Sequence, residues 1–426
     1  MKIEEIRDDA IWYYNLGGMM EFCVQYMVKL DEDIDADILR NALDTTMLRY
    51  PYLMKELKAN EKGYTLVDNP RPVVIVPGHE KIAVCGKEAN FHQFVVSYEG
   101  KWFFINAHHG LFDGGGRTNF LHTLIYYYCK EKYNEDVEMP GVYLVDTPID
   151  PGEYASTYDV DFSDVTEEEP LDDVNIDTLD LMKMGRVNPS KCQIHSLRIS
   201  EKQLMACCKT MDATPNTAIS TLLARAIYRV HPDCEQTIVP GVAVNMKKAL
   251  GIPKTHLSEV TSVSLKFTPE MKNMDFSEQN TILRGQLMLA STPEKQRQAG
   301  KKLFRISEEI NAESSLSRKK EAALKGMIEM LASPKTFTIS YANPVNYGSC
   351  EKHIEHVYSN PGSQFPMLLL ELTVANGWFF INWTQGWHEE VYFNAFLKEA
   401  ISLGLDFDLL YTTVPELIKC DLPTLE

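Results

Sequence analysis

The sequence predicts an α/β protein of two similar halves, each a mixed β-sheet flanked by helices, with a channel running between them. Three observations support this fold class. The 426 residues exceed what one hydrophobic core usually serves. Apolar stretches typical of strands alternate with stretches of helical periodicity. A segment from the first half of the chain also reappears near its end.

Composition and charge limit the classes of protein that fit. The chain is 44% hydrophobic and 24% charged, which is typical of a soluble globular protein. It has no uncharged apolar run of roughly 18 residues that could span a membrane, and residues 1–9 lack the layout of a signal peptide. The net charge of -18 disfavours nucleic acid as a partner. We therefore expect a cytoplasmic protein that binds neither nucleic acid nor membrane.

The cysteines indicate neither a disulfide framework nor a zinc site. The chain has nine, an odd number, and they show no repeated C-x-x-C spacing. Cys207 and Cys208 are adjacent on a predicted helix. This pattern favours reduced thiols in a reducing compartment.

The first half begins with a predicted strand and a capped helix. Residues 19–28 have the length and residue types of a strand. Asp35 can cap a following helix, whose apolar residues share one face until Pro51 ends it. Further strands are predicted near residues 71–76, 91–98 and 101–107, the last two joined by a turn at Glu99 and Gly100.

An acidic segment separates the two halves. Residues 159–180 carry ten acidic and no basic side chains, and like-charge repulsion disfavours packed structure there. We therefore expect an N-terminal half over residues 1–155, an acidic crossover over 156–190 and a C-terminal half over 191–426. In the last of these, Ser200 with Gln203 forms a plausible capping box, and Thr214 precedes a long apolar helix that opens with Pro215.

The repeated segment is the most informative feature of organisation. Residues 100–110 resemble residues 376–386, with Trp102 matching Trp378 at a constant offset of 276 residues. The match predicts the same unit of strand, loop and helix in both halves. Only the first copy carries reactive side chains, because His109 is matched by Gln385. We therefore expect one site per chain.

Histidine in this position suits proton transfer. Its ordinary pKa, near 6.5, leaves a largely neutral imidazole that can take a proton at neutral pH and return it. His108 and His109 follow the predicted strand at 101–107, where neighbouring side chains alternate between faces, so only one should face a given cleft. Asp113 follows at a junction between loop and helix. Glycines at four nearby positions permit positive φ angles and close backbone approach: Gly110, Gly114, Gly115 and Gly116.

These residues carry a resemblance to a known family. His108 to Gly114 reads H-H-x-x-x-D-G, which resembles the signature of condensation domains of peptide synthetases. The shorter H-x-x-x-D-G is similar to that of chloramphenicol acetyltransferases, dihydrolipoyl acyltransferases, plant BAHD acyltransferases and alcohol acetyltransferases. The resemblance covers most of the chain in the expected order, although the D-F-G-W-G motif of the plant branch is absent. It implies two chloramphenicol-acetyltransferase-like subdomains with the active-site channel between them.

The resemblance also implies roles for single residues. His109 would be the general base, and Asp113 a structural residue turned toward a cationic partner, either Lys247 or Lys248. Ser340 would supply a hydroxyl that stabilises the oxyanion. The co-substrate would be acyl-CoA or an acyl-phosphopantetheine on a carrier protein, with no permanently bound cofactor. The acceptor would be a small molecule with a hydroxyl or amine, and the protein a monomer.

Other interpretations of the same residues remain open. A catalytically silent relative could bind an acyl carrier or another protein through the channel. His108, His109 and Asp113 could form a metal site, although no further H-x-E or H-x-x-H partner is present. A membrane glycerolipid acyltransferase fits less well, because its motif has four residues between histidine and aspartate.

Overall fold

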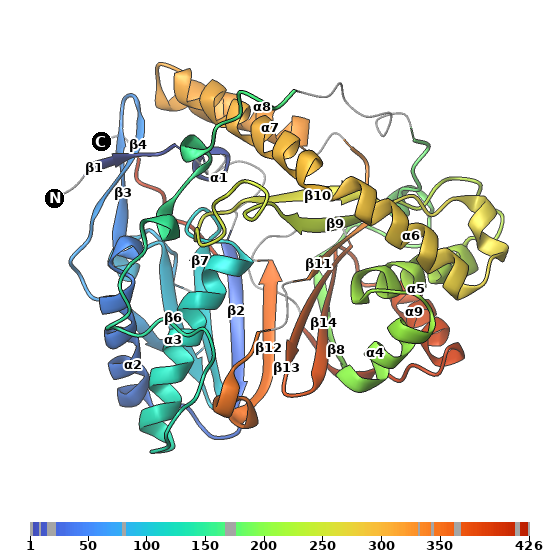
Figure 1. Cartoon of the computed structure of the whole chain (residues 1–426), viewed down its shortest axis with the longest axis horizontal. Coiled ribbons are helices and arrows are strands. Elements are labelled where there is room, and N and C mark those ends of the chain that lie inside the picture. Colours follow the sequence, from blue (N-terminus) through green and yellow to red (C-terminus); the bar gives the residue numbers. More distant parts are fainter. Residues whose placement is uncertain are drawn as a thin grey trace.

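The computed structural model describes residues 3–7, 10–14, 23–78, 82–166, 176–330, 333–341, 345–361, 368–413 and 418–424. Two lobes lie side by side, each built on a β-sheet that has helices against it (Figure 1). Both sheets contain parallel and antiparallel neighbours. The predicted α/β class with two mixed sheets is confirmed.

The first lobe contains a five-stranded sheet in the order β12-β2-β7-β6-β5. Only β5 runs parallel to its neighbour. The bounds of these strands are β2 Cys23–Leu30, β5 Ile75–Pro77, β6 Phe94–Glu99, β7 Trp102–His108 and β12 Ile354–Pro361.

The second lobe contains a seven-stranded sheet in the order β10-β9-β11-β13-β14-β8-β15. Its β9, β11 and β13 run parallel, and the remaining neighbours are antiparallel. The bounds are β8 Gln193–Ser200, β9 Pro240–Asn245, β10 Val260–Ser264, β11 Phe337–Tyr341, β13 Leu369–Ala375, β14 Trp378–Gln385 and β15 Asp408–Thr413.

A small third sheet was not predicted. It has the order β1-β4-β3, with bounds β1 Ile3–Glu5, β3 Lys55–Asn60 and β4 Gly63–Asp68. The predicted strand at 71–76 is displaced, since the only strand there is β5, which starts at Ile75. The β3 sequence KELKAN is polar and carries little of the alternation that marks a strand.

The helices cover the sheets, and the two largest clusters of buried apolar residues lie one in each lobe. In the first lobe, Leu39 and Leu43 of α2 and Phe120 and Leu124 of α3 are buried with the strands. In the second lobe, helices α5 and α9 fill the same role. The bounds are α1 Ala10–Tyr14, α2 Ala36–Arg49, α3 Gly114–Lys132, α4 Glu201–Thr210, α5 Pro215–Val230, α6 Phe276–Ala290, α7 Pro293–Ala312, α8 Leu316–Met330 and α9 Val391–Ser402.

The repeated sequence unit is a repeated structural unit. Segment 102–108 forms β7, which is hairpin-paired with β6 and followed by α3. Segment 378–385 forms β14, which is hairpin-paired with β13 and followed by α9. The prediction from the 276-residue offset is confirmed, and it places the histidine loop in the first lobe.

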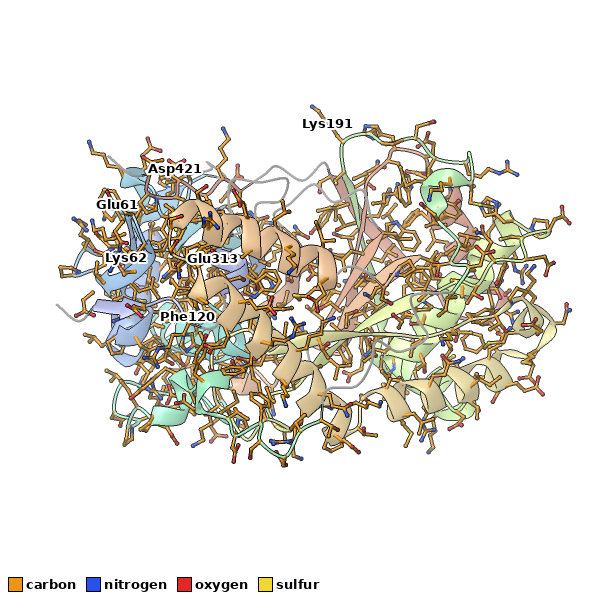
Figure 2. All side chains as sticks on the ribbon, turned by 90° about the horizontal axis from the view of Figure 1, so that it is seen from above. Glu61, Lys62, Phe120, Lys191, Glu313 and Asp421 are labelled. Atoms are coloured by element: carbon orange, nitrogen blue, oxygen red, sulfur yellow. The ribbon has the colours of Figure 1, made fainter. Side chains whose placement is uncertain are left out.

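The chain crosses between the lobes more than once. Strand β12 follows β11 in sequence, yet it pairs with β2 in the sheet of the first lobe. The last described segment also returns, because the Asp421 backbone N–H donates to the Val84 carbonyl at 2.9 Å. Figure 2 shows Asp421 on the same lobe as Glu61 and Lys62, with Lys191 on the other. The boundaries at 155 and 190 stay a prediction.

The helix N-termini show which of the capping residues predicted from the sequence form cap hydrogen bonds. Asp35 accepts from the backbone N–H groups of residues 37 and 38, as predicted, and Thr214 with Thr217 forms a capping box on α5. The capping box of Ser200 with Gln203 is wrong. Ser200 precedes α4 without a side-chain cap bond, and the Gln203 amide instead donates to the Gly404 carbonyl at 2.8 Å.

The predicted strand at 19–28 is only partly within the described residues, and the prediction about membrane spans can be compared with the described helices. Of the predicted strand at 19–28, residues 23–28 lie in β2 and residues 19–22 lie outside the described residues. None of the described helices is both long and apolar enough to cross a lipid bilayer.

Candidate active site

His108 is the last residue of strand β7, and its side chain is buried. It is 1% exposed and pairs across the sheet with Cys23 of β2. Its ring lies against Tyr13 with centroids 4.8 Å apart, and its Nδ1 accepts from the Gly110 backbone N–H at 3.1 Å. Burial lowers the pKa of His108 to about 4. His108 is therefore neutral and shapes the loop that follows.

His109 is the first residue after β7, so strand alternation does not by itself set its direction. Its side chain is partly exposed and lies flat against Trp12 of α1, with centroids 4.7 Å apart. Nδ1 is buried and bonds no other described residue. Burial lowers the pKa of His109, while its own backbone and the charge of Asp113 act in the opposite direction. The ring is a neutral base at neutral pH.

Asp113 is the N-cap residue of helix α3 and is almost fully buried. Its Oδ1 accepts from the Gly116 backbone N–H at 2.8 Å and pairs with Lys247 Nζ at 2.6 Å. The cation is itself 3% exposed and also donates to the Thr255 carbonyl at 2.8 Å. Of the two lysines predicted as partners, Lys247 is the one, and Lys248 is exposed. Asp113 thus ties the first lobe to the segment after β9.

The glycines act here by leaving space. None of Gly110, Gly114, Gly115 or Gly116 has positive φ, so the predicted need for a left-handed backbone is not met. A Cβ at Gly116 would collide with the His256 carbonyl, and one at Gly110 would lie 2.8 Å from the Tyr13 ring. Gly114 is the first residue of α3, and its carbonyl accepts from the Thr118 hydroxyl at 2.7 Å.

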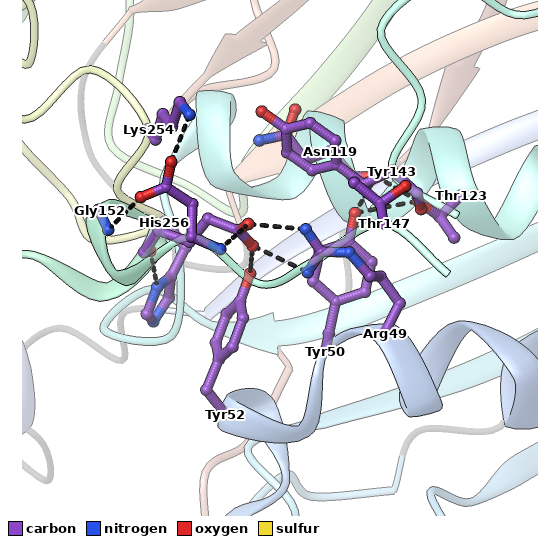
Figure 3. Close-up of polar contacts among 12 residues, drawn as sticks. Arg49, Tyr50, Tyr52, Asn119, Thr123, Tyr143, Thr147, Gly152, Lys254 and His256 are labelled. Atoms are coloured by element: carbon purple, nitrogen blue, oxygen red, sulfur yellow. Dashed lines mark hydrogen bonds and ion pairs between the residues drawn. The ribbon is translucent and has the colours of Figure 1, made fainter. Parts of the chain in front are cut away.

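A buried ion pair, drawn in Figure 3, is linked to the histidine loop through His256. Arg49 of α2 donates to both carboxylate oxygens of Glu153, at 2.6 and 2.9 Å. The side chains are 1% and 3% exposed. The Glu153 carbonyl accepts from both the backbone and the ring of His256, whose own carbonyl accepts from the Asp113 N–H at 3.2 Å. One chain of contacts therefore runs from α2 to Asp113.

Comparison with solved structures identifies the fold. F. graminearum TRI101 complexed with ethyl coenzyme A matches with a TM-score of 0.60 and 12% identity, covering 95% of this chain and 100% of that one. The first condensation domain of the calcium-dependent antibiotic synthetase, with a substrate analogue, matches with a TM-score of 0.59 and 13% identity over 95% and 97%. Polyketide synthase associated protein 5 from Mycobacterium tuberculosis matches with a TM-score of 0.55 and 14% identity over 93% and 97%.

This chain has the same two-lobed fold as TRI101 and the condensation domain. The resemblance stated from the sequence is confirmed at this level. No protein-family model matches the sequence, and none of the curated proteins does. At 11–14% identity the likeness concerns the fold, so the roles of single residues rest on the geometry of this chain.

Ser340 lies in the second lobe, whereas the histidine loop follows a strand of the first lobe. It is a partly exposed residue of β11 and sits opposite Glu371 of β13. No hydrogen bond or ion pair between described residues joins it to His109. Its predicted role at the oxyanion stays a prediction.

Sequence reasoning missed the side chains that surround His109. Trp12 lies about a hundred positions earlier and belongs to a five-residue helix, so no spacing rule connects it to the histidine. It also lines a pocket with Ser258 and Glu259 that does not include His109. Trp12 therefore contacts both the pocket and the imidazole.

The same residues do not assemble as a metal site. Within the described ranges no group of three histidine, cysteine or acidic side chains is placed to hold a metal ion. Asp113 Oδ1 pairs with Lys247, and His108 Nδ1 accepts from Gly110.

Proposed function

We propose that this protein transfers an acyl group from a coenzyme A or carrier-protein thioester to a hydroxyl or amine acceptor, with His109 as the general base. One observation carries the proposal. In a fold shared with proteins solved with coenzyme A, the one partly exposed histidine of the H-H-x-x-x-D-G segment is held neutral, with Nδ1 buried. The other ring nitrogen, Nε2, is then the atom available to an acceptor.

The reaction follows from acid–base chemistry at that nitrogen. Nε2 takes the proton of the acceptor as its oxygen or nitrogen attacks the thioester carbonyl. A tetrahedral oxyanion forms, and its collapse breaks the bond between carbon and sulfur. The proton on His109 then passes to the departing thiolate, which leaves as free thiol. The enzyme forms no covalent intermediate, and the imidazole ends in its starting state.

The neighbouring residues have supporting parts in this scheme. Asp113 is bound to Lys247 and caps α3, so it holds the loop rather than moving a proton. His108 is buried, and its Nδ1 holds the backbone of Gly110. Ser340 is proposed as the hydroxyl donor to the oxyanion. The pocket that Trp12 lines is proposed to lie on the channel by which one substrate approaches. We further propose that one chain holds the complete site and acts as a monomer.

Thiol release tests the proposal. The protein is incubated with acyl-CoA donors of increasing chain length and with panels of alcohols and amines, and free thiol is measured over time. His109→Gln copies the residue at the matching position of the second half, Gln385, and changes the shape of the site little. Since a general base contributes about 10²- to 10⁴-fold, we expect a loss of that size in turnover.

The control is His388→Gln, which removes an exposed histidine from the corresponding loop of the second lobe. It should retain full turnover. Turnover that survives His109→Gln would reject His109 as the base. Turnover with an acyl-phosphopantetheine carrier but not with acyl-CoA would assign the donor to a carrier protein. No turnover with either donor would favour the catalytically silent relative.

A further inference from the structure

A second set of polar side chains lies where the two sheets meet, away from the bonds that hold the histidine loop. Tyr26 of β2 pairs in register with Ser359 of β12, the edge strand of the first sheet. The Ser359 hydroxyl donates to Glu371 Oε1 at 3.3 Å, and Glu371 belongs to β13 of the second sheet. Across β13, Glu371 neighbours Ser340 of β11. One row of side chains thus connects the two lobes.

Arg117 adds a cation to this row. It follows Asp113 by one turn of α3 and is 4% exposed. Its guanidinium lies over the Tyr26 ring, 4.1 Å from the centroid. A guanidinium carries five N–H donors, and a ring face satisfies none of them as a hydrogen bond. No described residue pairs with this side chain, and Nε is buried without an acceptor.

Glu371 is similarly left without a full set of partners. Its Oε2 is buried and accepts no hydrogen bond from a described residue. Burial raises the pKa of Glu371 to about 7, although the charge of Arg117 and the Ser359 hydroxyl lower it. Arg117 and Glu371 are linked through the Tyr26 ring and Ser359, yet the described ion pairs do not include the two together.

A guanidinium whose Nε lacks an acceptor and a carboxylate whose Oε2 lacks a donor are each unfavourable when buried, unless something binds them. An anion alone would be repelled by Glu371, and a cation alone by Arg117. A molecule with an amino group and a carboxylate satisfies both without adding net charge. The site is joined to the histidine loop through α3, because Arg117 lies one turn after Asp113, the N-cap residue of that helix.

We propose that Arg117 and Glu371 bind the acceptor, and that the acceptor is a free amino acid whose carboxylate pairs with Arg117 and whose amino nitrogen faces Glu371. This inference rests on the proposed function, because it names the class of molecule that the acyl group is transferred to. It adds a binding role for two residues outside the H-H-x-x-x-D-G segment.

Calorimetric binding to the full chain tests the site separately from the chemistry. The His109→Gln protein is titrated with the standard amino acids, with primary amines that lack the carboxylate, and with carboxylic acids that lack the amine. We expect at least one amino acid to bind and its two truncated forms to bind roughly 10- to 100-fold more weakly, as for loss of a hydrogen bond to a charged group.

Two variants assign the two contacts. Glu371→Gln should weaken binding of the amino acid and of the amine but not of the carboxylic acid. Arg117→Lys should weaken binding of the amino acid and of the carboxylic acid. Arg198→Lys is the matched control, because Arg198 also lies over an aromatic ring, Trp378 at 4.2 Å, but is partly exposed and paired with Asp408. Its binding should equal that of the parent protein.

The outcomes separate this inference from the proposed function. If no amino acid binds, or if the two variants bind as the parent does, the row holds water only and the inference is overturned. Acyl transfer to alcohols without amino-acid binding would leave the proposed function standing and reject this site. Amino-acid binding that depends on both residues, without acyl transfer, would support this site and reject the proposed function.

Discussion

The indole of Trp12 lies flat against the imidazole of His109, with the ring planes 11° from parallel. The two residues are far apart in sequence, and the contact joins α1 to the loop after β7. It covers one face of the ring that we propose as the base and leaves the edge that carries Nε2 as the direction from which an acceptor donates its proton. It also adds to the burial that lowers the pKa of His109.

Replacing Trp12 therefore changes the pH dependence of the reaction. Trp12→Ala admits water to the ring and moves the pKa of His109 up toward its ordinary value near 6.5. Because the base must be neutral, the acid limb of kcat/KM should move to higher pH, and kcat/KM should fall by roughly tenfold or more as the ring loses its fixed position. Trp12→Phe keeps a stacked ring and should keep the limb below pH 6.5. An unchanged profile in Trp12→Ala would show that the stacking does not tune the base.

The Asp113–Lys247 pair should show strong coupling. Lys247→Met leaves a buried carboxylate without its cation, which costs about 3–5 kcal/mol in the free energy of unfolding. The double variant Asp113→Asn with Lys247→Met removes both charges and should recover a large part of that loss. Urea denaturation of the parent, both single variants and the double variant measures the coupling. Strictly additive losses would mean that the pair does not hold the loop.

Local signals predicted much of the fold. Asp35 and Thr214 have a side chain of the right type directly before an apolar helical stretch, so their caps follow from a few adjacent residues. The repeat of Trp102 as Trp378 identified the two lobes because both copies form the same hairpin and helix. The return of β12 to the first sheet was not predictable in this way. Its partner β2 lies more than 300 residues earlier.

In the candidate site, too, residues close together in the sequence were predicted, and residues brought together only by the fold were not. His109 and Asp113 lie within five residues of each other and carry a recognisable spacing. Lys247 was one of two adjacent possibilities, and only packing distinguishes the buried one from the exposed one. Trp12 and Glu371 have no spacing signal, because tertiary contacts between separate elements bring them into place. A sequence alone gives the reactive group but not what surrounds it.

The Arg49–Glu153 pair should be essential to stability and to the loop. Arg49→Met leaves Glu153 buried without its bidentate partner, and we expect a loss of about 3–5 kcal/mol in the free energy of unfolding. Lys183→Met removes the cation of an exposed pair with Asp180 and should change stability by less than about 1 kcal/mol. Denaturant titration compares the two variants. Equal small effects would mean that water reaches and screens the Arg49 pair.

His122 offers the clearest test of stability against pH. It is 7% exposed, its Nε2 has no partner among the described residues, and burial lowers its pKa to about 4. The unfolded chain therefore binds its proton near pH 6.5 while the folded chain does not, so this residue lowers stability as pH falls from 6.5 to 4. At pH 5 the cost is about 2 kcal/mol, and above pH 7 it vanishes. His122→Gln, which cannot titrate, should melt higher relative to the parent at pH 5 than at pH 8. A gap between the two proteins that stays constant with pH would show that His122 titrates alike in the folded and unfolded chains.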